Sequence, residues 1–115
     1  MTQLKDKVVG TSYRPEILPI ASYEGTIDTS KDLPVFTGFG MLVPEPGNVY
    51  DPNAIMVLIK KKDGTGHHVG YVRKNSPIYQ YAGAHGVTPA TVKIIGYSQI
   101  GDMNDSYQII IDTDE

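Results

Sequence analysis

A chain of 115 residues, 40% hydrophobic and 20% charged, is long enough for one globular domain and too short for two ordinary ones. The absence of cysteine excludes disulfides and thiolate metal sites, and no apolar run approaches the roughly 20 residues of a membrane helix. A formal net charge of −3 argues against an indiscriminate nucleic-acid binder. Because no signal-peptide core follows Met1, we expect a cytoplasmic protein with no membrane association.

The first 43 residues predict three short strands and a long irregular excursion. Residues 5–12 predict the first strand. Prolines and glycines interrupt residues 13–40, so this excursion is expected to be irregular, with a short strand around Thr26. Residues 41–43 predict another short strand, which Pro44 must end.

Residues 54–73 predict a β-hairpin. Residues 54–60, Ala-Ile-Met-Val-Leu-Ile-Lys, form a nearly continuous apolar run of strand length, which predicts a strand covered on both faces. An Asp-Gly turn follows within residues 62–66, and residues 67–73 predict the partner strand.

A short helix is expected next. Ser76 can cap the free amide groups of a helix start, and Pro77 suits the first helical position. Gly83 and Gly86 should then stop the helix after about two turns.

Residues 91–97 and 107–112 predict the last two strands, joined by a polar turn at residues 101–105. Five or six short strands with one or two short helices indicate a mostly β fold. We expect a small OB-like or SH3-like curved barrel of about six strands, with residues 1–115 forming a single domain.

Charge is unevenly distributed along the chain. Residues 60–93 contain six basic residues and one acid, Asp63, whereas five acids and no base follow Lys93. This pattern indicates a locally positive segment in an acidic protein, and it is equally typical of a solvated surface with a charged tail.

Three segments carry residue types suited to ligand binding. They are residues 8–15 (Val-Val-Gly-Thr-Ser-Tyr-Arg-Pro), 45–55 (Glu-Pro-Gly-Asn-Val-Tyr-Asp-Pro-Asn-Ala-Ile) and 68–74 (His-Val-Gly-Tyr-Val-Arg-Lys). Taken alone, the second segment is typical of an Asx-type turn, because its Asn and Asp side chains can bond nearby backbone groups. The third places Val69, Tyr71 and Arg73 on one face of a strand, with Gly70 marking a β-bulge or a close approach.

In this order and spacing, the three segments resemble the HIRAN domain. This family occurs as a stand-alone bacterial protein and as a module of Snf-type DNA-dependent ATPases, including helicase-like transcription factor. Residues 48–55 look like the family's N-x-Y-D-x-N-A-[IV] signature, with Val-Val-Gly before them and Val-Gly-Tyr after them. The match runs from Val8 to about Tyr97, apart from the excursion at 13–40.

The resemblance implies an OB-like barrel that captures the free 3′-hydroxyl end of single-stranded DNA. It implies that Tyr13 stacks on the terminal nucleotide, that Asp51 accepts the hydroxyl, and that Asn48 and Lys74 hold the end. The DNA-binding residues predicted in this way are Tyr13, Arg14, Asn48, Asp51, Tyr71, Arg73 and Lys74. The implied partners are single-stranded DNA or DNA ends and a DNA-dependent ATPase or other repair protein.

Binding of one ligand by both Tyr71 and Lys74 sets a geometric condition. Lys74 lies three residues after Tyr71, so the two would face opposite ways on a regular strand. The strand must therefore turn before Lys74 if both residues touch one ligand. The sequence also departs from the helicase-fused members, which have arginine at Ser12, a second aromatic at Arg14 and histidine at Tyr71, and its excursion is longer than their loop.

Two other functions stay open. The first is a protein-interaction module that keeps the fold without a DNA site, because the net charge is acidic and Ser12 replaces the arginine. This reading expects an exposed apolar patch on the excursion, made of Ile17, Leu18, Ile20, Val35, Phe36 and Phe39.

The second is a metal-dependent hydrolase or nuclease that uses Asp51 with His67 or His68. Adjacent strand residues point to opposite faces, so the two histidines should not share one ion. No nucleotide-binding or nucleophile motif is present. We therefore expect a binding module with no enzyme activity, cofactor or metal site.

Overall fold

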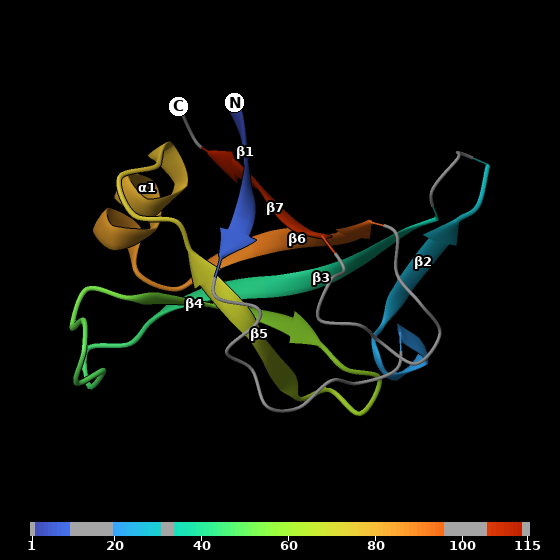
Figure 1. Cartoon of the computed structure of the whole chain (residues 1–115), viewed down its shortest axis with the longest axis horizontal. Coiled ribbons are helices and arrows are strands. Elements are labelled where there is room, and N and C mark those ends of the chain that lie inside the picture. Colours follow the sequence, from blue (N-terminus) through green and yellow to red (C-terminus); the bar gives the residue numbers. More distant parts are fainter. Residues whose placement is uncertain (1, 10–19, 31–33, 96–105, 114–115) are drawn as a thin grey trace.

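One antiparallel sheet organises residues 2–9, 20–30, 34–95 and 106–113, which are the residues described in the computed structural model (Figure 1). Its strands are β1 (Thr2–Val9), β2 (Gly25–Asp28), β3 (Val35–Pro44), β4 (Ile55–Lys60), β5 (Gly66–Val72), β6 (Thr88–Ile95) and β7 (Ser106–Thr113). The helix α1 (Pro77–His85) and a 3-10 turn (Ile20–Ser22) complete the described elements.

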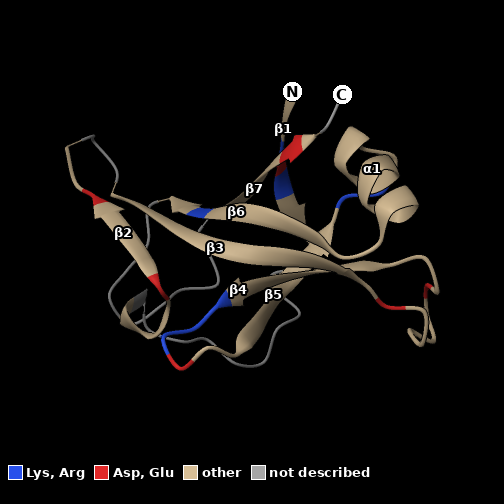
Figure 2. Ribbon diagram, turned by 180° about the vertical axis from the view of Figure 1, so that it is seen from behind, with Lys and Arg blue, Asp and Glu red and all other residues tan. Residues whose placement is uncertain are grey.

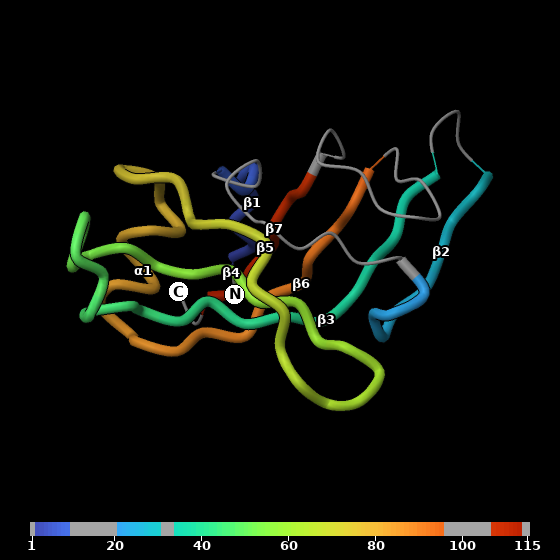
Figure 3. The backbone as a smooth tube through the Cα atoms, turned by 60° about the horizontal axis from the view of Figure 1, so that its bottom comes forward, coloured from blue at the N-terminus to red at the C-terminus, as the bar shows by residue number. Residues whose placement is uncertain are grey.

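The sheet curves until its two sides meet. The strand order is β2-β3-β4-β5-β1-β7-β6, and an additional pairing of β3 with β6 closes six of these strands into a near-barrel ring. Strand β2 pairs with β3 and lies outside the ring (Figure 3). The predicted mostly β fold, a curved barrel of about six strands, is therefore confirmed.

Strand β3 makes the closure possible because it is ten residues long. Residues 40–44 pair with β4, whereas residues 35–42 pair with β6. The prediction of a strand at residues 41–43 was too short. Pairing with β2 on one side and with β6 on the other stabilises the glycine-rich segment from Val35, where local propensity alone disfavours a strand.

The core fills the inside of the ring with aliphatic side chains that alternate along the strands. Fully buried examples are Leu42, Val57, Ile59, Val92, Ile94, Ile109 and Ile111. Each such side chain contributes about 1.5–3 kcal/mol of transfer free energy on burial. The expectation that β4 is covered on both faces was wrong: Ile55, Val57 and Ile59 are buried, whereas Met56 and Leu58 stay partly exposed. A strand of an antiparallel sheet can pack one face on the core and leave the other face in contact with water.

The predicted hairpin between β4 and β5 is confirmed. Gly64 has a φ of 90°, which an L side chain rarely adopts. The Asp63 carboxylate accepts hydrogen bonds from the Thr65 backbone N–H at 2.9 Å and from its hydroxyl at 2.6 Å. The turn residues therefore fix the register of the two strands.

The predicted helix start is also confirmed. Ser76 Oγ accepts from the Tyr79 backbone N–H at 3.1 Å and donates to the Arg73 carbonyl at 2.7 Å. The helix continues past Gly83 and ends at Gly86, whose φ is 78°. With nine residues it is far too short to cross a membrane, and no other described helix is long enough. Its buried Ile78 packs into the core, so α1 covers one end of the ring (Figure 1).

The remaining strand predictions hold with shifted ends. Strand β2 confirms the short strand around Thr26, and β1 begins earlier than predicted, at Thr2. Strand β6 begins at Thr88 although Pro89 cannot donate a ladder bond. Pro89 is tolerated because β7 pairs with β6 only from Thr91 onward. The predicted turn at 101–105 lies outside the described residues.

Gly40 provides a test of the closure. It pairs with Ile59 on one side and with Ala90 on the other, and a Cβ atom there would overlap the Leu58 carbonyl and lie 2.7 Å from Val92 Cγ2. We expect Gly40→Ala to lower the free energy of unfolding by about 1–3 kcal/mol, measured by urea denaturation.

The matched control is Gly47→Ala, where no atom lies within 4 Å of the added methyl group. It should change the free energy of unfolding by no more than about 0.5 kcal/mol. Equal stability of the two variants would show that the close approach at Gly40 is not needed for closure.

Candidate functional site

The loop of residues 45–54, between β3 and β4, is held by its own polar side chains. Asn48 Oδ1 accepts from the backbone N–H groups of Tyr50 and Asp51 at 2.9 and 3.0 Å. Asp51 Oδ1 accepts from the Asn53 N–H at 3.0 Å. These are the Asx-type turns predicted from the sequence. They fix the backbone from which Tyr50 and Asp51 extend.

Glu45 ties this loop to strand β5. Its Oε1 accepts from Asn48 Nδ2 at 2.6 Å and from the Tyr71 hydroxyl at 3.2 Å. The Tyr71 ring also meets the His68 ring edge-on, with centroids 4.8 Å apart. Tyr71 is therefore held in place by a carboxylate at its tip and by an aromatic ring at its side.

An ion pair joins the loop to the segment between β5 and α1. Lys74 Nζ lies 2.8 Å from Asp51 Oδ2. The hydrogen bond from Lys74 and the Asn53 N–H lower the pKa of Asp51, and the Asp51 carboxylate raises the pKa of Lys74. Both groups are therefore charged at neutral pH.

Strand β5 contains the expected irregularity. Its register with β4 steps from Val57 opposite Gly70 to Leu58 opposite His68, which leaves Val69 as the extra residue of a β-bulge. The bulge predicted at Gly70 thus lies one residue earlier. The expected common face of Val69, Tyr71 and Arg73 was wrong, because the bulge turns Val69 into the core.

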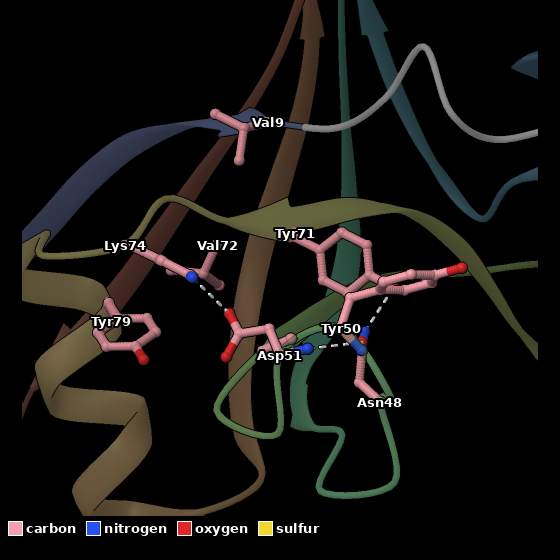
Figure 4. Close-up of a pocket in the computed structure, with 9 residues that line it drawn as sticks. Val9, Asn48, Tyr50, Asp51, Tyr71, Val72, Lys74 and Tyr79 are labelled. Atoms are coloured by element: carbon pink, nitrogen blue, oxygen red, sulfur yellow. Dashed lines mark hydrogen bonds and ion pairs between the residues drawn. The ribbon is translucent and has the colours of Figure 1, made fainter.

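These elements enclose an open pocket of about 650 Å³. Its lining residues are Val9, Asn48, Tyr50, Asp51, Ala54, Tyr71, Val72, Lys74 and Tyr79. Figure 4 shows Tyr79 of α1 on one side, Tyr50 and Tyr71 on the other, and the Asp51–Lys74 pair between them. Tyr50 is 96% exposed, which is unusual for an aromatic residue.

The structure brings together four of the seven predicted site residues. Asn48, Asp51, Tyr71 and Lys74 all line the pocket. Strand β5 ends at Val72 and the chain then turns, so the geometric condition on Lys74 is met.

The other three predicted residues have different outcomes. Arg73 does not line the pocket, and its Nε lies 3.2 Å from Asp6 Oδ2 on β1. Tyr13 and Arg14 lie outside the described residues, as does Ser12.

Sequence reasoning missed Tyr50, Tyr79, Val9 and the bracing residue Glu45. Tyr50 is the tyrosine of the N-x-Y-D stretch and directly precedes Asp51, so its place in that stretch was the available signal. Tyr79 gave no comparable signal, because a tyrosine beside Ile78 in a short helix is typical of core packing.

The locally basic segment is largely neutralised in the fold. Lys60 pairs with Glu24 at 3.2 Å and Lys61 with Asp63 at 3.7 Å, while Arg73 and Lys74 are paired as described above. Three of these four acids come from outside residues 60–93. Figure 2 shows basic and acidic segments interspersed over the described elements. The charge run thus does not form a continuous basic face within the described part of the chain.

The histidines have structural contacts. The His67 ring lies beside the Tyr23 ring, with centroids 6.0 Å apart, and His68 Nε2 is 2.8 Å from the Gly70 carbonyl oxygen. Across the described ranges, no cluster of three or more His, Cys, Asp or Glu side chains could hold a metal ion.

The chain was compared with known protein families, curated proteins and solved structures. No protein-family model, curated protein or solved structure matches the chain. The likeness of residues 48–55 to the HIRAN signature therefore stays a prediction. The pocket itself offers a charged carboxylate, an ammonium group and three tyrosine rings.

The Asp51–Lys74 pair predicts a specific response to pH. We expect Lys74→Met to raise the pKa of Asp51 toward its ordinary value of 3.8, because the largest stabiliser of the carboxylate is removed. Since the folded-state pKa is lowered, the pair stabilises the fold above pH 3.8 and this contribution is lost as pH falls through the folded-state pKa. The variant should lose less stability on acidification.

Carboxyl-carbon NMR titration of Asp51 measures the shift, with urea denaturation at several pH values alongside. Lys61→Met removes the same charge from the hairpin and should leave the pKa of Asp51 unchanged. An Asp51 pKa that is equal in wild type and Lys74→Met would show that the pair does not persist in solution.

Proposed function

We propose that the pocket binds the 3′ end of single-stranded DNA, as a binding module without catalysis. One observation carries the proposal: a charged carboxylate, Asp51, is held between tyrosine rings and beside a lysine. In a site for a polyanion, a fixed carboxylate repels phosphate. It therefore favours the part of the strand that presents a hydroxyl group in place of a phosphate.

Asp51 has the bonding capacity for this role. Its Oδ1 accepts one bond from the Asn53 N–H, and its Oδ2 contacts Lys74. A carboxylate offers about four lone-pair positions, so two others can accept a terminal hydroxyl. Because the carboxylate is already fixed by the loop, little conformational entropy is lost when the hydroxyl binds.

The tyrosines provide flat surfaces for bases. Tyr50 extends from a braced loop, Tyr71 is held by Glu45, and Tyr79 projects from the first turn of α1 (Figure 4). Stacking of a base on an aromatic side chain contributes about 1–3 kcal/mol and depends little on sequence. Exposing Tyr50 to water is consistent with a ring that a ligand covers.

Lys74 and Asn48 differ in what they can offer. The ammonium of Lys74 has three donors, and those not directed at Asp51 can reach a phosphate. Asn48 uses both ends of its amide within the loop and toward Glu45. We assign Asn48 to positioning Asp51 and Tyr50, and not to holding the DNA end directly.

The resemblance to the HIRAN family supports the same ligand. Of the signature residues within 48–55, Asn48, Tyr50, Asp51 and Ala54 line the pocket. A role in DNA repair or processing, with a DNA-dependent ATPase or another repair protein as partner, follows from that resemblance alone.

A protein-interaction module is the second candidate. Phe39, which lies on β3, is 62% exposed. Phe36 of the same predicted patch is buried in the core, which removes it from any surface. Ile17 and Leu18 lie outside the described residues, and Ile20 is described in its backbone only. This candidate predicts that no single-stranded DNA binds.

The first test uses fluorescence anisotropy to compare two oligonucleotides that differ only in the group at the 3′ end. A 5′-labelled thymidine octanucleotide with a free 3′-hydroxyl should bind wild type about 10- to 150-fold more tightly than its 3′-phosphorylated form, because a hydrogen bond to a charged group contributes about 1.5–3 kcal/mol. Asp51→Asn should weaken binding of the hydroxyl form and strengthen binding of the phosphorylated form.

Asp28→Asn is the matched control, because it removes the same charge from β2. It should leave the preference for the free hydroxyl intact. If Asp51→Asn instead tightens binding of both oligonucleotides, Asp51 acts only as a repulsive charge and end recognition is wrong. No binding of either oligonucleotide would favour the protein-interaction candidate.

The second test removes the most exposed ring. Tyr50→Ala should weaken binding of the free-hydroxyl octanucleotide by roughly 5- to 150-fold, which corresponds to the loss of one stacking contact. The free energy of unfolding should change little, because the side chain is almost fully exposed.

The neighbouring Val49→Ala is the control, since Val49 is 87% exposed in the same loop and does not line the pocket. It should leave the dissociation constant unchanged. Equal affinities of Tyr50→Ala and wild type would remove Tyr50 from the binding site.

A further inference from the structure

A second hollow of about 390 Å³ lies between β3 and the β4–β5 hairpin. Its lining residues are Phe39, Gly40, Met41, Leu58, Ile59, Lys60, Gly64, Thr65 and Gly66. Glycine at position 66 leaves the space open, because a Cβ atom there would lie 3.3 Å from Leu58 Cδ1. The Asp51 pocket does not use any of these residues.

Strand register places both hollows on one face of the sheet. Met56 is paired with Tyr71 on β5 and with Val43 on β3. Directly opposed residues in an antiparallel ladder point to the same face. The partly exposed face of β4 is therefore the face on which Tyr71 lines the pocket.

The next pairs along β4 extend that face to the second hollow. Leu58 is paired with His68 and with Met41. His68 and Tyr71 share the face because of the bulge at Val69, and their rings are in contact. Phe39, two residues before Met41 on β3, lies on the same side.

Two large apolar residues are exposed on this face. Phe39 is 62% exposed and Met41 is 47% exposed. Both are at the hollow, at the far end of the face from Asp51. Large exposed apolar groups that adjoin a binding pocket are typical of a ligand surface.

Cations border the hollow. Lys60 lines it, and its Nζ lies 3.2 Å from Glu24 at the surface. Lys61 and the exposed Lys62 follow in the turn. Across the three lysines, Glu24 and Asp63, the local charge is one positive unit, which favours an anionic occupant.

We propose that this face carries the upstream nucleotides of the same strand whose 3′ end occupies the Asp51 pocket. A base stacks on Phe39, and phosphates approach the lysines of the β4–β5 turn. The inference rests on the proposed function and names its occupant, single-stranded DNA, from the continuity of the face and from its aromatic and cationic groups.

The length of the path sets the expected site size. From Tyr71 to Phe39 the path crosses two strand spacings and about four residues along β3, which is roughly 17 Å on a flat sheet. At the stacked spacing of about 3.4 Å per nucleotide, this distance corresponds to roughly five nucleotides. Such a length is within the range of about 4–16 nucleotides bound by one OB-type barrel.

The test is a length series in the same anisotropy assay. Thymidine oligonucleotides of three, six and eight nucleotides, all with free 3′-hydroxyls, are titrated into wild type, Phe39→Ala and Ile27→Ala. We expect wild type to bind the octanucleotide roughly 5- to 150-fold more tightly than the trinucleotide, with most of the gain reached by six nucleotides. Phe39→Ala should abolish this increase of affinity with length and leave the affinity for the trinucleotide unchanged.

Ile27 is a matched control because it is similarly exposed but lies on the other face of the sheet from Phe39. It pairs with Phe36, whose side chain is in the core, and paired residues point to the same face. Ile27→Ala should retain the full gain with length. Amide NMR spectra provide a second measurement: signals of Phe39, Met41 and Leu58 should shift with the octanucleotide and stay unshifted with the trinucleotide.

The outcomes separate this inference from the proposed function. End-dependent binding that does not tighten with length, or a gain that survives Phe39→Ala, overturns the extended path and leaves the pocket intact. Binding that strengthens with length but ignores a 3′-phosphate overturns the end-capture function and leaves a general strand-binding face. If no oligonucleotide binds, both proposals are wrong.

Discussion

Strand β3 pairs with β6 over residues 35–42 and with β4 over residues 40–44, so residues 40–42 pair with both. Met41 and Leu42 keep their side chains at this overlap. Position 40 has no room for one, because a Cβ atom there would overlap the Leu58 carbonyl and lie 2.7 Å from Val92 Cγ2. The closed ring then buries one face of every strand of the ring and leaves the opposite face of β4 and β5 available.

The pocket follows from this closure. The loop of residues 45–54 begins where β3 ends, and the turn to α1 begins where β5 ends, so both lie at one end of the ring. Helix α1 packs Ile78 into the core and thereby directs Tyr79 toward the loop. The polar and aromatic groups of the pocket are thus placed by the loop of residues 45–54, by β5 with the segment after it, and by α1. The Asp51–Lys74 ion pair and the Glu45–Tyr71 hydrogen bond join the loop to β5 and to the segment after it.

The parts of the fold that local chemistry dictates could be predicted from the sequence. The Asp-Gly turn, the Ser76 cap and the Asx bonds of residues 48–53 each depend on neighbours within about three residues. The start of β3 could not be predicted, because residues 35–38 are stabilised by pairing on both sides, with β2 and with β6, and the β6 partners lie 54–60 residues away. The same holds for the site: Asn48, Asp51, Tyr71 and Lys74 were selected through a resemblance, whereas the pairing of Arg73 with Asp6 depends on β1 lying beside β5 in the sheet. The locally basic segment was misleading for that reason, since the fold supplies acids from segments outside residues 60–93.

This neutralisation determines what kind of binding the surface can support. A protein that relies on phosphate contacts gains affinity from each cation and loses it steeply as salt rises. Here most described cations of residues 60–74 already have an acidic partner, so a phosphate must compete with a carboxylate for each. Bases that stack on Tyr50 and Phe39 do not compete with a protein group in this way, because both residues are exposed to solvent. The acidic net charge and the proposed DNA site are therefore compatible: the charges limit binding along an arbitrary stretch of strand, and the aromatic rings with Asp51 favour an end.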